Sequence, residues 1–198
     1  VAGSTYGGDK AIVYGGYGST TNTKYNLINN VGVVAADATG APTGRQGSAG
    51  SKFGSAGEAI FAYGTANINI SFIVTDQGVP GSDRTGVGTA RKYIACASFG
   101  GDRCVFAFGS NNSYLAVSNK VSNTGVVASD TSAVGTPRIG VTGTGYGGDK
   151  GIIAYGQVSS GKTNVSNLVS NTGVVAADTS GVGTASQAGN SAGYSTSA

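Results

Sequence analysis

The stretches Ser122–Thr136 (SNTGVVASDTSAVGT) and Ser170–Thr184 (SNTGVVAADTSGVGT) decide the fold class of this chain. They begin 48 residues apart and differ at two positions. Each holds an Asn-Thr-Gly turn, a short apolar run and an acid. Near-identical segments within one chain indicate a repeat architecture, in which each unit buries its apolar face against its neighbours.

Four landmarks recur in one register along the chain, at a period of about 47 residues. They are an aromatic before a Gly-rich turn, an acid after that turn, a second acid, and an Arg eight residues further on. The aromatics are Tyr6, Phe53, Phe99 and Tyr146, with another copy at Tyr194; the turn acids are Asp9, Glu58, Asp102 and Asp149. The second acids are Asp37, Asp83, Asp130 and Asp178, and they are followed by Arg45, Arg91, Arg138 and, breaking the pattern, Ser186. We predict a single repeat domain over 1–198, with repeats at approximately 1–45, 46–91, 92–138 and 139–186 and an extra first strand or tail at 187–198.

Composition and periodicity both indicate β-structure. Gly supplies 36 of the 198 residues without a Gly-X-Y period, which argues against collagen and long helices, because Gly costs about 1 kcal/mol relative to Ala inside a helix. The hydrophobic fraction of 39% is too high for a disordered chain. Apolar and polar residues alternate over Lys92–Phe99, as in a strand, and a Gly-Gly-Asp hairpin turn follows. The sequence therefore predicts an all-β fold.

Each repeat is expected to hold four short strands. In the first repeat, Ala11–Tyr14, Tyr25–Ile28 and Val33–Ala36 follow the first strand, and similar runs occur in the others. Four strands every 40 to 50 residues or so are typical of a β-propeller blade. Pro80 falls in a fourth-strand position, which suits an outer edge because proline donates no ladder hydrogen bond. We predict a four-bladed β-propeller, with a β-solenoid-like stack as the alternative.

The first-strand segment occurs five times, once more than any other strand. Its last copy, Gln187–Tyr194, has three interpretations. It closes the propeller ring, or it pairs with a neighbouring subunit so that Gln187 and Tyr194 make subunit contacts, or the chain beginning at Val1 is a window of a longer array. An unpaired strand favours association because its N–H and C=O groups are exposed.

The chain offers little for catalysis. It contains no His, so imidazole-based catalytic and metal sites are excluded, and its acids recur once per repeat, as structural residues do. We predict no enzyme activity, no catalytic residue, no cofactor and no metal site. The formal net charge of +3 comes without a basic run, which predicts no nucleic-acid binding. Since no apolar stretch reaches the 18 or so residues of a spanning helix, no membrane segment is expected.

The repeated acids and arginines are predicted to be structural: Asp37, Asp83, Asp130, Asp178, Arg45, Arg91 and Arg138. Each Asp is expected to accept hydrogen bonds from N–H groups of its own loop, as in an Asx-turn. Pairing of each Asp with the Arg eight residues on would tie successive repeats together. The functional alternative is calcium binding by these loops, although no loop contains the several clustered acids that calcium favours.

Two further sets of side chains leave alternatives open. Cys96 and Cys104 flank a hairpin turn and form either a disulfide, which would indicate an oxidising compartment, or a pair of buried thiols. Tyrosines in or beside the second strand either stack on glycans or pack between repeats. These tyrosines are Tyr14, Tyr63, Tyr114 and Tyr155.

Two runs resemble known repeats. The run Gly7–Gly16 (GGDKAIVYGG) resembles the core of a kelch-type repeat, a short apolar strand between two glycine pairs, although the Trp typical of kelch blades is absent. The run Val121–Ser132 (VSNTGVVASDTS) resembles Gly-rich repeats of bacteriophage tail-fibre and other virion-surface proteins. The first resemblance implies propeller blades, and the second implies a structural or host-attachment role.

We therefore expect a structural subunit of an extracellular assembly, either a surface filament or a virion tail fibre, whose main partner is itself. The alternative is a lectin-like propeller that binds surface glycans. Both interpretations place the protein outside the cell or on a virion surface.

Overall fold

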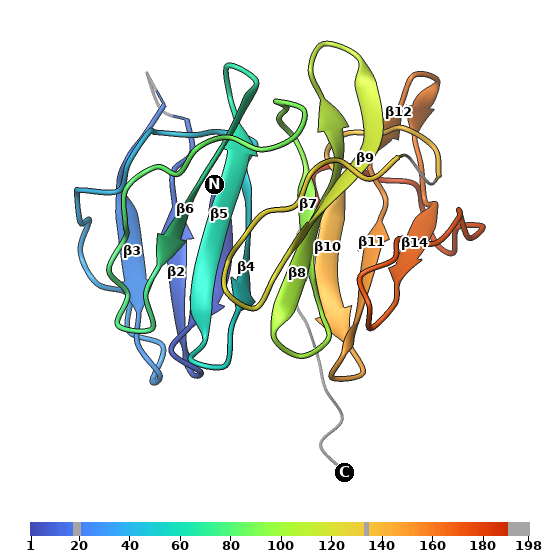
Figure 1. The fold of residues 1–198 in the computed structure, drawn as a ribbon. Helices are drawn as coiled ribbons and strands as arrows, with labels where there is room; N and C mark the ends of the chain where they lie inside the picture. The colour runs from blue at the N-terminus through green and yellow to red at the C-terminus, as the bar shows by residue number, and fades with distance from the viewer. Residues whose placement is uncertain (18–20, 133–134, 190–198) are drawn as a thin grey trace.

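The computed structural model describes residues 1–17, 21–132 and 135–189, and every regular element in these ranges is a β-strand (Figure 1). The prediction of an all-β fold is confirmed. In the described residues there is no helix with the length and apolar character needed to cross a membrane.

The strands form four antiparallel three-stranded sheets in chain order. The first sheet consists of β1 (Ala2–Tyr6), β2 (Lys10–Tyr14) and β3 (Tyr25–Ile28), and the second of β4 (Ala49–Phe53), β5 (Glu58–Gly64) and β6 (Ile68–Val74). The third consists of β7 (Ala95–Phe99), β8 (Arg103–Ser110) and β9 (Tyr114–Val121), and the fourth of β10 (Thr142–Tyr146), β11 (Lys150–Ala154) and β14 (Ser166–Val169). A small hairpin of β12 (Gln157–Val158) and β13 (Gly161–Lys162) precedes β14.

The expected fourth strand of each repeat is not a strand, so the prediction of four-stranded repeats is wrong. In the first repeat this outer segment pairs with β3 only at two isolated bridges, Ile28 with Val34 and Tyr25 with Ala38. Between the bridges the outer segment has one residue more than β3, a bulge that interrupts the ladder. Bridges at equivalent residues, with the same one-residue excess, recur in the other three repeats.

The first strands stand in a row. β1 contacts β4, β4 contacts β7 and β7 contacts β10, and Figure 1 shows the four sheets side by side in this order. Among the described residues no comparable contact joins β10 back to β1. The described residues therefore do not form the closed four-bladed ring that the sequence predicts. They form an open row of sheets.

Three apolar cores lie between the sheets, because successive residues of a strand point to opposite faces. In β8, Cys104 and Phe106 pack toward the second repeat, while Val105 and Ala107 pack toward the fourth. Each core is thus built jointly by two neighbouring repeats. A repeat buries its apolar residues only by having neighbours.

In the first three repeats, the aromatic at the end of the first strand packs against a glycine turn of the next repeat. Phe99 is 2% exposed, and a Cβ added to Gly173 would lie 2.5 Å from its ring. The turn needs glycine for two reasons: a side chain would collide with the Phe99 ring, and Gly173 has a φ of +74°. The same contact joins Tyr6 to Gly78 and Phe53 to Gly125.

We predict that Gly173→Ala destabilises the fold more than Gly32→Ala, the same position in the first repeat. Both glycines have positive φ, +74° and +82°, so both substitutions strain the backbone. Only Gly173 faces an aromatic ring, since no described atom lies within 4 Å of a Cβ at Gly32. Urea unfolding at low protein concentration should show an extra loss of about 1–3 kcal/mol for Gly173→Ala. Equal losses would contradict this packing.

Candidate functional site

Three arginines with no exposed surface mark the junctions between repeats: Arg45, Arg91 and Arg138. Each ends a Thr-x-Arg segment at the end of its repeat. A guanidinium this deep is tolerated only when its N–H groups find partners, since burying an unpaired charge is costly. The junctions therefore have to supply those partners.

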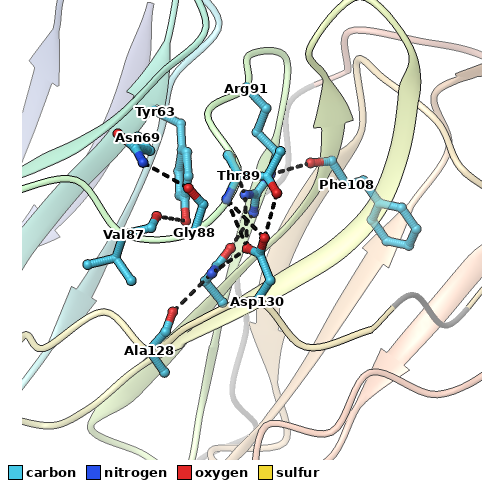
Figure 2. Close-up of polar contacts among 10 residues, drawn as sticks. Tyr63, Asn69, Val87, Gly88, Thr89, Arg91, Phe108, Ala128 and Asp130 are labelled. Atoms are coloured by element: carbon cyan, nitrogen blue, oxygen red, sulfur yellow. Dashed lines mark hydrogen bonds and ion pairs between the residues drawn. The ribbon is translucent and has the colours of Figure 1, made fainter.

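Arg91 joins the second repeat to the third (Figure 2). Its Nη1 donates to the carbonyl oxygen of Thr89 at 3.0 Å, and its Nε donates to that of Phe108, in the next repeat, at 2.9 Å. Its Nη2 donates to Oδ1 of Asn119 at 2.7 Å. The guanidinium lies 4.1 Å from the ring centroid of Tyr63, a cation–π contact within the Arg's own repeat.

The carboxylate of Asp130 completes the same junction. It accepts hydrogen bonds from the backbone N of Thr89 at 2.9 Å and from its Oγ1 at 2.5 Å. Asn119 holds this carboxylate in place, because its Nδ2 donates to Asp130 and to the carbonyl of Ala128, both at 2.9 Å. One repeat therefore offers a Thr-x-Arg arm, and the next offers an Asn–Asp pair that receives it.

The junction between the third and fourth repeats is built in the same way. Arg138 donates to Asn167 and, at 3.0 Å, to the carbonyl of Tyr155, and it stacks 4.0 Å from the Phe108 ring. The carboxylate of Asp178 accepts from the backbone N and Oγ1 of Thr136.

The junction between the first and second repeats has one exception. Phe72 stands at the Asn position of β6, so Arg45 pairs directly with Asp83 and stacks 5.1 Å from the Phe72 ring. The arm is otherwise the same, since Thr43 donates to the Asp83 carboxylate through its backbone N at 3.1 Å and its Oγ1 at 2.6 Å.

This geometry corrects the expected partners of the repeated acids. Asp83, Asp130 and Asp178 accept hydrogen bonds from the Thr of the preceding repeat, in place of N–H groups of their own loops. Their arginine is likewise the one of the preceding repeat, 38 to 40 residues earlier, and not the one eight residues on. The spacing along the sequence cannot show this pairing. The extra residue in the outer segment turns the Asp side chain toward the preceding repeat, away from its own loop.

Burial and hydrogen bonding shift the pKa values of the junction groups in opposite directions. Burial alone would raise the pKa of Asp130, but the hydrogen bonds from Thr89 and Asn119 outweigh it, and the pKa is lowered overall. Asp178 behaves in the same way. Burial lowers the pKa of Arg138 to about 10, with Asp178 opposing the shift, so this guanidinium keeps its charge at neutral pH.

Among the described residues no arm packs on the first repeat, and its Asn–Asp pair is open. The Asp37 carboxylate pairs with Nζ of Lys24 at 2.8 Å, in the place where the acids of the other repeats bind a Thr-x-Arg arm. The Asp37 side chain is 53% exposed. At the other end, the arm of the fourth repeat ends in Ser186, where the others have Arg. Of the two predicted subunit contacts, Gln187 directly follows this arm, and Tyr194 lies outside the described residues.

Cys96 and Cys104 are free thiols, buried in the core between the second and third repeats. They are diagonal neighbours across two strands, because Cys96 pairs with Phe106 and Cys104 pairs with Ser98. Burial, and then the neighbouring Cys104, raise the pKa of the Cys96 thiol well above its ordinary value, which makes it a poor nucleophile. Of the two alternatives for this pair, the structure contains the buried thiols.

The four tyrosines considered for glycan contact do not form one surface. Tyr14 and Tyr63 are 1% and 0% exposed, and their hydroxyls donate to the carbonyls of Thr43 and Val87, so they offer no face to a ligand. Tyr114 and Tyr155 are partly exposed. Within the described ranges, no three Cys, Asp or Glu side chains gather closely enough to hold a metal ion.

The sequence alone did not single out the Thr and Asn members of the junction. The Thr residues carry a visible signal, since each precedes the Arg position by two residues, at Thr43, Thr89, Thr136 and Thr184. The Asn residues, Asn26, Asn119 and Asn167, lie in the third strands, where a buried polar residue stands out only once burial is known. No protein-family model matches the chain, and no curated protein matches it.

We predict that Arg91→Ala lowers the free energy of unfolding by about 3–5 kcal/mol, because it leaves Asn119 and a backbone carbonyl without their buried donor. Arg103→Ala is the control. Arg103 is 48% exposed and pairs with Asp102 at 3.6 Å, so its loss should cost under about 1 kcal/mol. Chemical denaturation measures both, and a small effect for Arg91 would mean that the junction does not hold the fold.

Stability should also fall in acid. Because the folded-state pKa values of Asp130 and Asp178 are lowered, the stabilisation from their ionised forms is complete above the unfolded value of about 4 and is lost as pH falls through the folded values. We expect a constant unfolding free energy from pH 8 to about 5 and a decline below about pH 4. A Thr89→Val variant, which removes one donor to Asp130, should show a shallower decline in urea titrations at each pH.

Proposed function

We propose that this protein is a structural subunit that associates with copies of itself in an extracellular assembly, such as a surface filament or a virion tail fibre. One observation carries the proposal: among the described residues, several apolar positions that are buried in the inner repeats are partly exposed at the two ends of the row of sheets.

The C-terminal end exposes residues that would face a following repeat. Ile152 is partly exposed, whereas the equivalent residues of the earlier repeats are 0–1% exposed. These equivalents are Ile12, Ile60 and Val105. Tyr146 is partly exposed, whereas Tyr6, Phe53 and Phe99 at the same position are 1–3% exposed.

The N-terminal end exposes the opposite set. Val13 is partly exposed, and its equivalents Phe61, Phe106 and Ile153 are 0% exposed. Ile28 is partly exposed as well, while its equivalents are 0–1% exposed; these are Val74, Val121 and Val169.

The two end surfaces support self-association. The C-terminal end presents the side of a junction that faces the next repeat, and the N-terminal end presents the side that faces the preceding repeat. The terminal repeats of isolated arrays usually carry polar faces that keep the array soluble. Within the ranges that the structure describes, apolar positions at both ends of this row are instead left uncovered. Two different faces that fit one another make a head-to-tail contact, which builds rings or filaments.

The finer architecture and the location are part of the proposal. The first strands of all four repeats line one groove of about 1140 Å³, as expected for an arc of a propeller. The resemblance of Gly7–Gly16 to kelch repeats and of Val121–Ser132 to virion-surface repeats favours a propeller-like element on a surface assembly.

Glycan binding is the second candidate, supported by the same groove. Its lining is rich in Ser, Thr and Gly and includes Tyr93, which is 37% exposed. Hydroxyls with an exposed aromatic ring are the groups that recognise sugars.

The proposal is tested by light scattering over a range of concentrations, with negative-stain electron microscopy of the same samples. We expect species at multiples of 19.3 kDa whose proportion rises with concentration. A single 19.3 kDa species at every concentration would contradict self-association. Sugar binding by that monomer on a glycan array would then establish the second candidate.

A further inference from the structure

We propose that the intermolecular contact repeats the register of the inner junctions, with the Thr184 arm of one copy received by the Asn26–Asp37 pair of the next. This inference rests on the proposed function and specifies its interface. Tyr146 then packs on the Gly32 turn of the second copy.

The arm of the fourth repeat already has the shape of an inner arm. Tyr155 Oη donates to the carbonyl of Val182 at 3.4 Å, Asn164 Nδ2 to that of Gly183 at 2.8 Å, and Gly156 N to that of Ser186 at 2.8 Å. In the second repeat the matching bonds measure 3.3, 2.8 and 2.9 Å. They run from Tyr63 to Val87, from Asn69 to Gly88 and from Gly64 to Arg91. Thr184 is thus held as Thr89 is held.

A vacant space lies beside this arm. A Cβ added to Gly88 or Gly135 would collide with the Asp of the next repeat, Asp130 or Asp178. At Gly183, the equivalent glycine, the nearest described atom is Tyr155 Oη at 3.7 Å. The fourth repeat therefore keeps open the space that an Asn–Asp pair fills in the inner junctions.

The first repeat presents such a pair, already arranged. Asn26 Nδ2 donates to Asp37 at 3.0 Å and to the carbonyl of Ala35 at 3.1 Å, as Asn119 and Asn167 do in their repeats. Lys24 pairs with the exposed carboxylate, but an exposed ion pair contributes little and is readily displaced.

Aromatic and backbone contacts agree with the same register. Among the described residues, no atom lies within 4 Å of a Cβ at Gly32, and no glycine turn covers Tyr146 as one covers each of its equivalents. Below the first strands, Gly54 N donates to Asp102 O at 2.8 Å and Gly100 N to Asp149 O at 2.7 Å, each across a junction. In the proposed register, the equivalent hydrogen bond between two copies runs from Gly147 N of one copy to Asp9 O of the other.

Ser186 makes the intermolecular junction weaker than the inner ones. In the second and third junctions the guanidinium stacks on an aromatic ring of its own repeat and bonds to the next repeat. Ser186 is too short to do either, although Tyr155 and the Asn26–Asp37 pair are both in place. The contact between copies is therefore reversible, while the inner junctions stay closed.

The test measures association constants of the full chain by sedimentation for the wild type and four variants. Thr184→Val and Asp37→Ala should each weaken association by about 10-fold or more, the usual effect of losing a hydrogen bond to a charged group. Ser186→Arg should tighten it by a similar factor. Glu58→Gln removes the same charge as Asp37→Ala from the second repeat and should leave association unchanged.

The double variant Asn26→Ala/Ser186→Arg decides the register. An arginine at position 186 would donate to Asn26, as Arg91 donates to Asn119 and Arg138 to Asn167, so the gain from Ser186→Arg should disappear when Asn26 is replaced. An unchanged gain would overturn the pairing of these two positions. Association that occurs in the wild type but is unaffected by Thr184→Val, Asp37→Ala and Ser186→Arg would overturn this register while leaving self-association intact. Absence of association even for Ser186→Arg would overturn both. Thermal unfolding of each variant identifies any loss that comes from misfolding.

Discussion

The buried guanidinium is the constraint on which the rest of the structure depends. Each of the three arginines sits between two repeats, and neither repeat alone can satisfy it. Carbonyls, an Asn or an Asp, and an aromatic ring have to converge on it from both sides. Truncating one member therefore leaves a charge or a polar group stranded in a dry interior. The apolar cores stabilise the packing of one repeat on the next, and the arginines fix how the two repeats are aligned.

The same arginines support an unusual backbone. Tyr63 and Phe108 adopt φ values of +63°, a region that costs a non-glycine residue roughly 1–3 kcal/mol, and both are followed by a glycine at positive φ. Arg91 stacks on the first ring and Arg138 on the second, while the carbonyl of Phe108 accepts from Arg91. These arginine contacts offset the strain. The register shifts of β5 and β8 at these two residues thereby become part of the contact between repeats.

The sequence predicted the repeat, the turns and three of the four segments per repeat, because these depend on local patterns. The end of each first strand was placed correctly at Tyr6, Phe53, Phe99 and Tyr146. The fourth segment was mistaken for a strand, since its Val-Val-Ala run has strand-like composition and its one-residue bulge is defined only against a partner. The partner of each acid could not be predicted either. The spacing of eight residues between each Asp and the following Arg favours the prediction of a local ion pair. Only the three-dimensional stacking of the repeats shows that each Asp pairs with the Arg of the preceding repeat.

The sharing of every core by two repeats has a consequence for how such a chain can change in length. A repeat with a core of its own could be lost or gained by itself, but here the unit that recurs along the chain is the junction between two repeats. Duplicating or deleting one whole period of about 47 residues leaves each arm facing the Asp of another repeat, with an Asn or, in the second repeat, Phe72 beside that Asp. The near-identity of residues 122–136 and 170–184 fits such a duplication. Length is therefore free to vary in whole repeats, while partial insertions would break the register at a guanidinium.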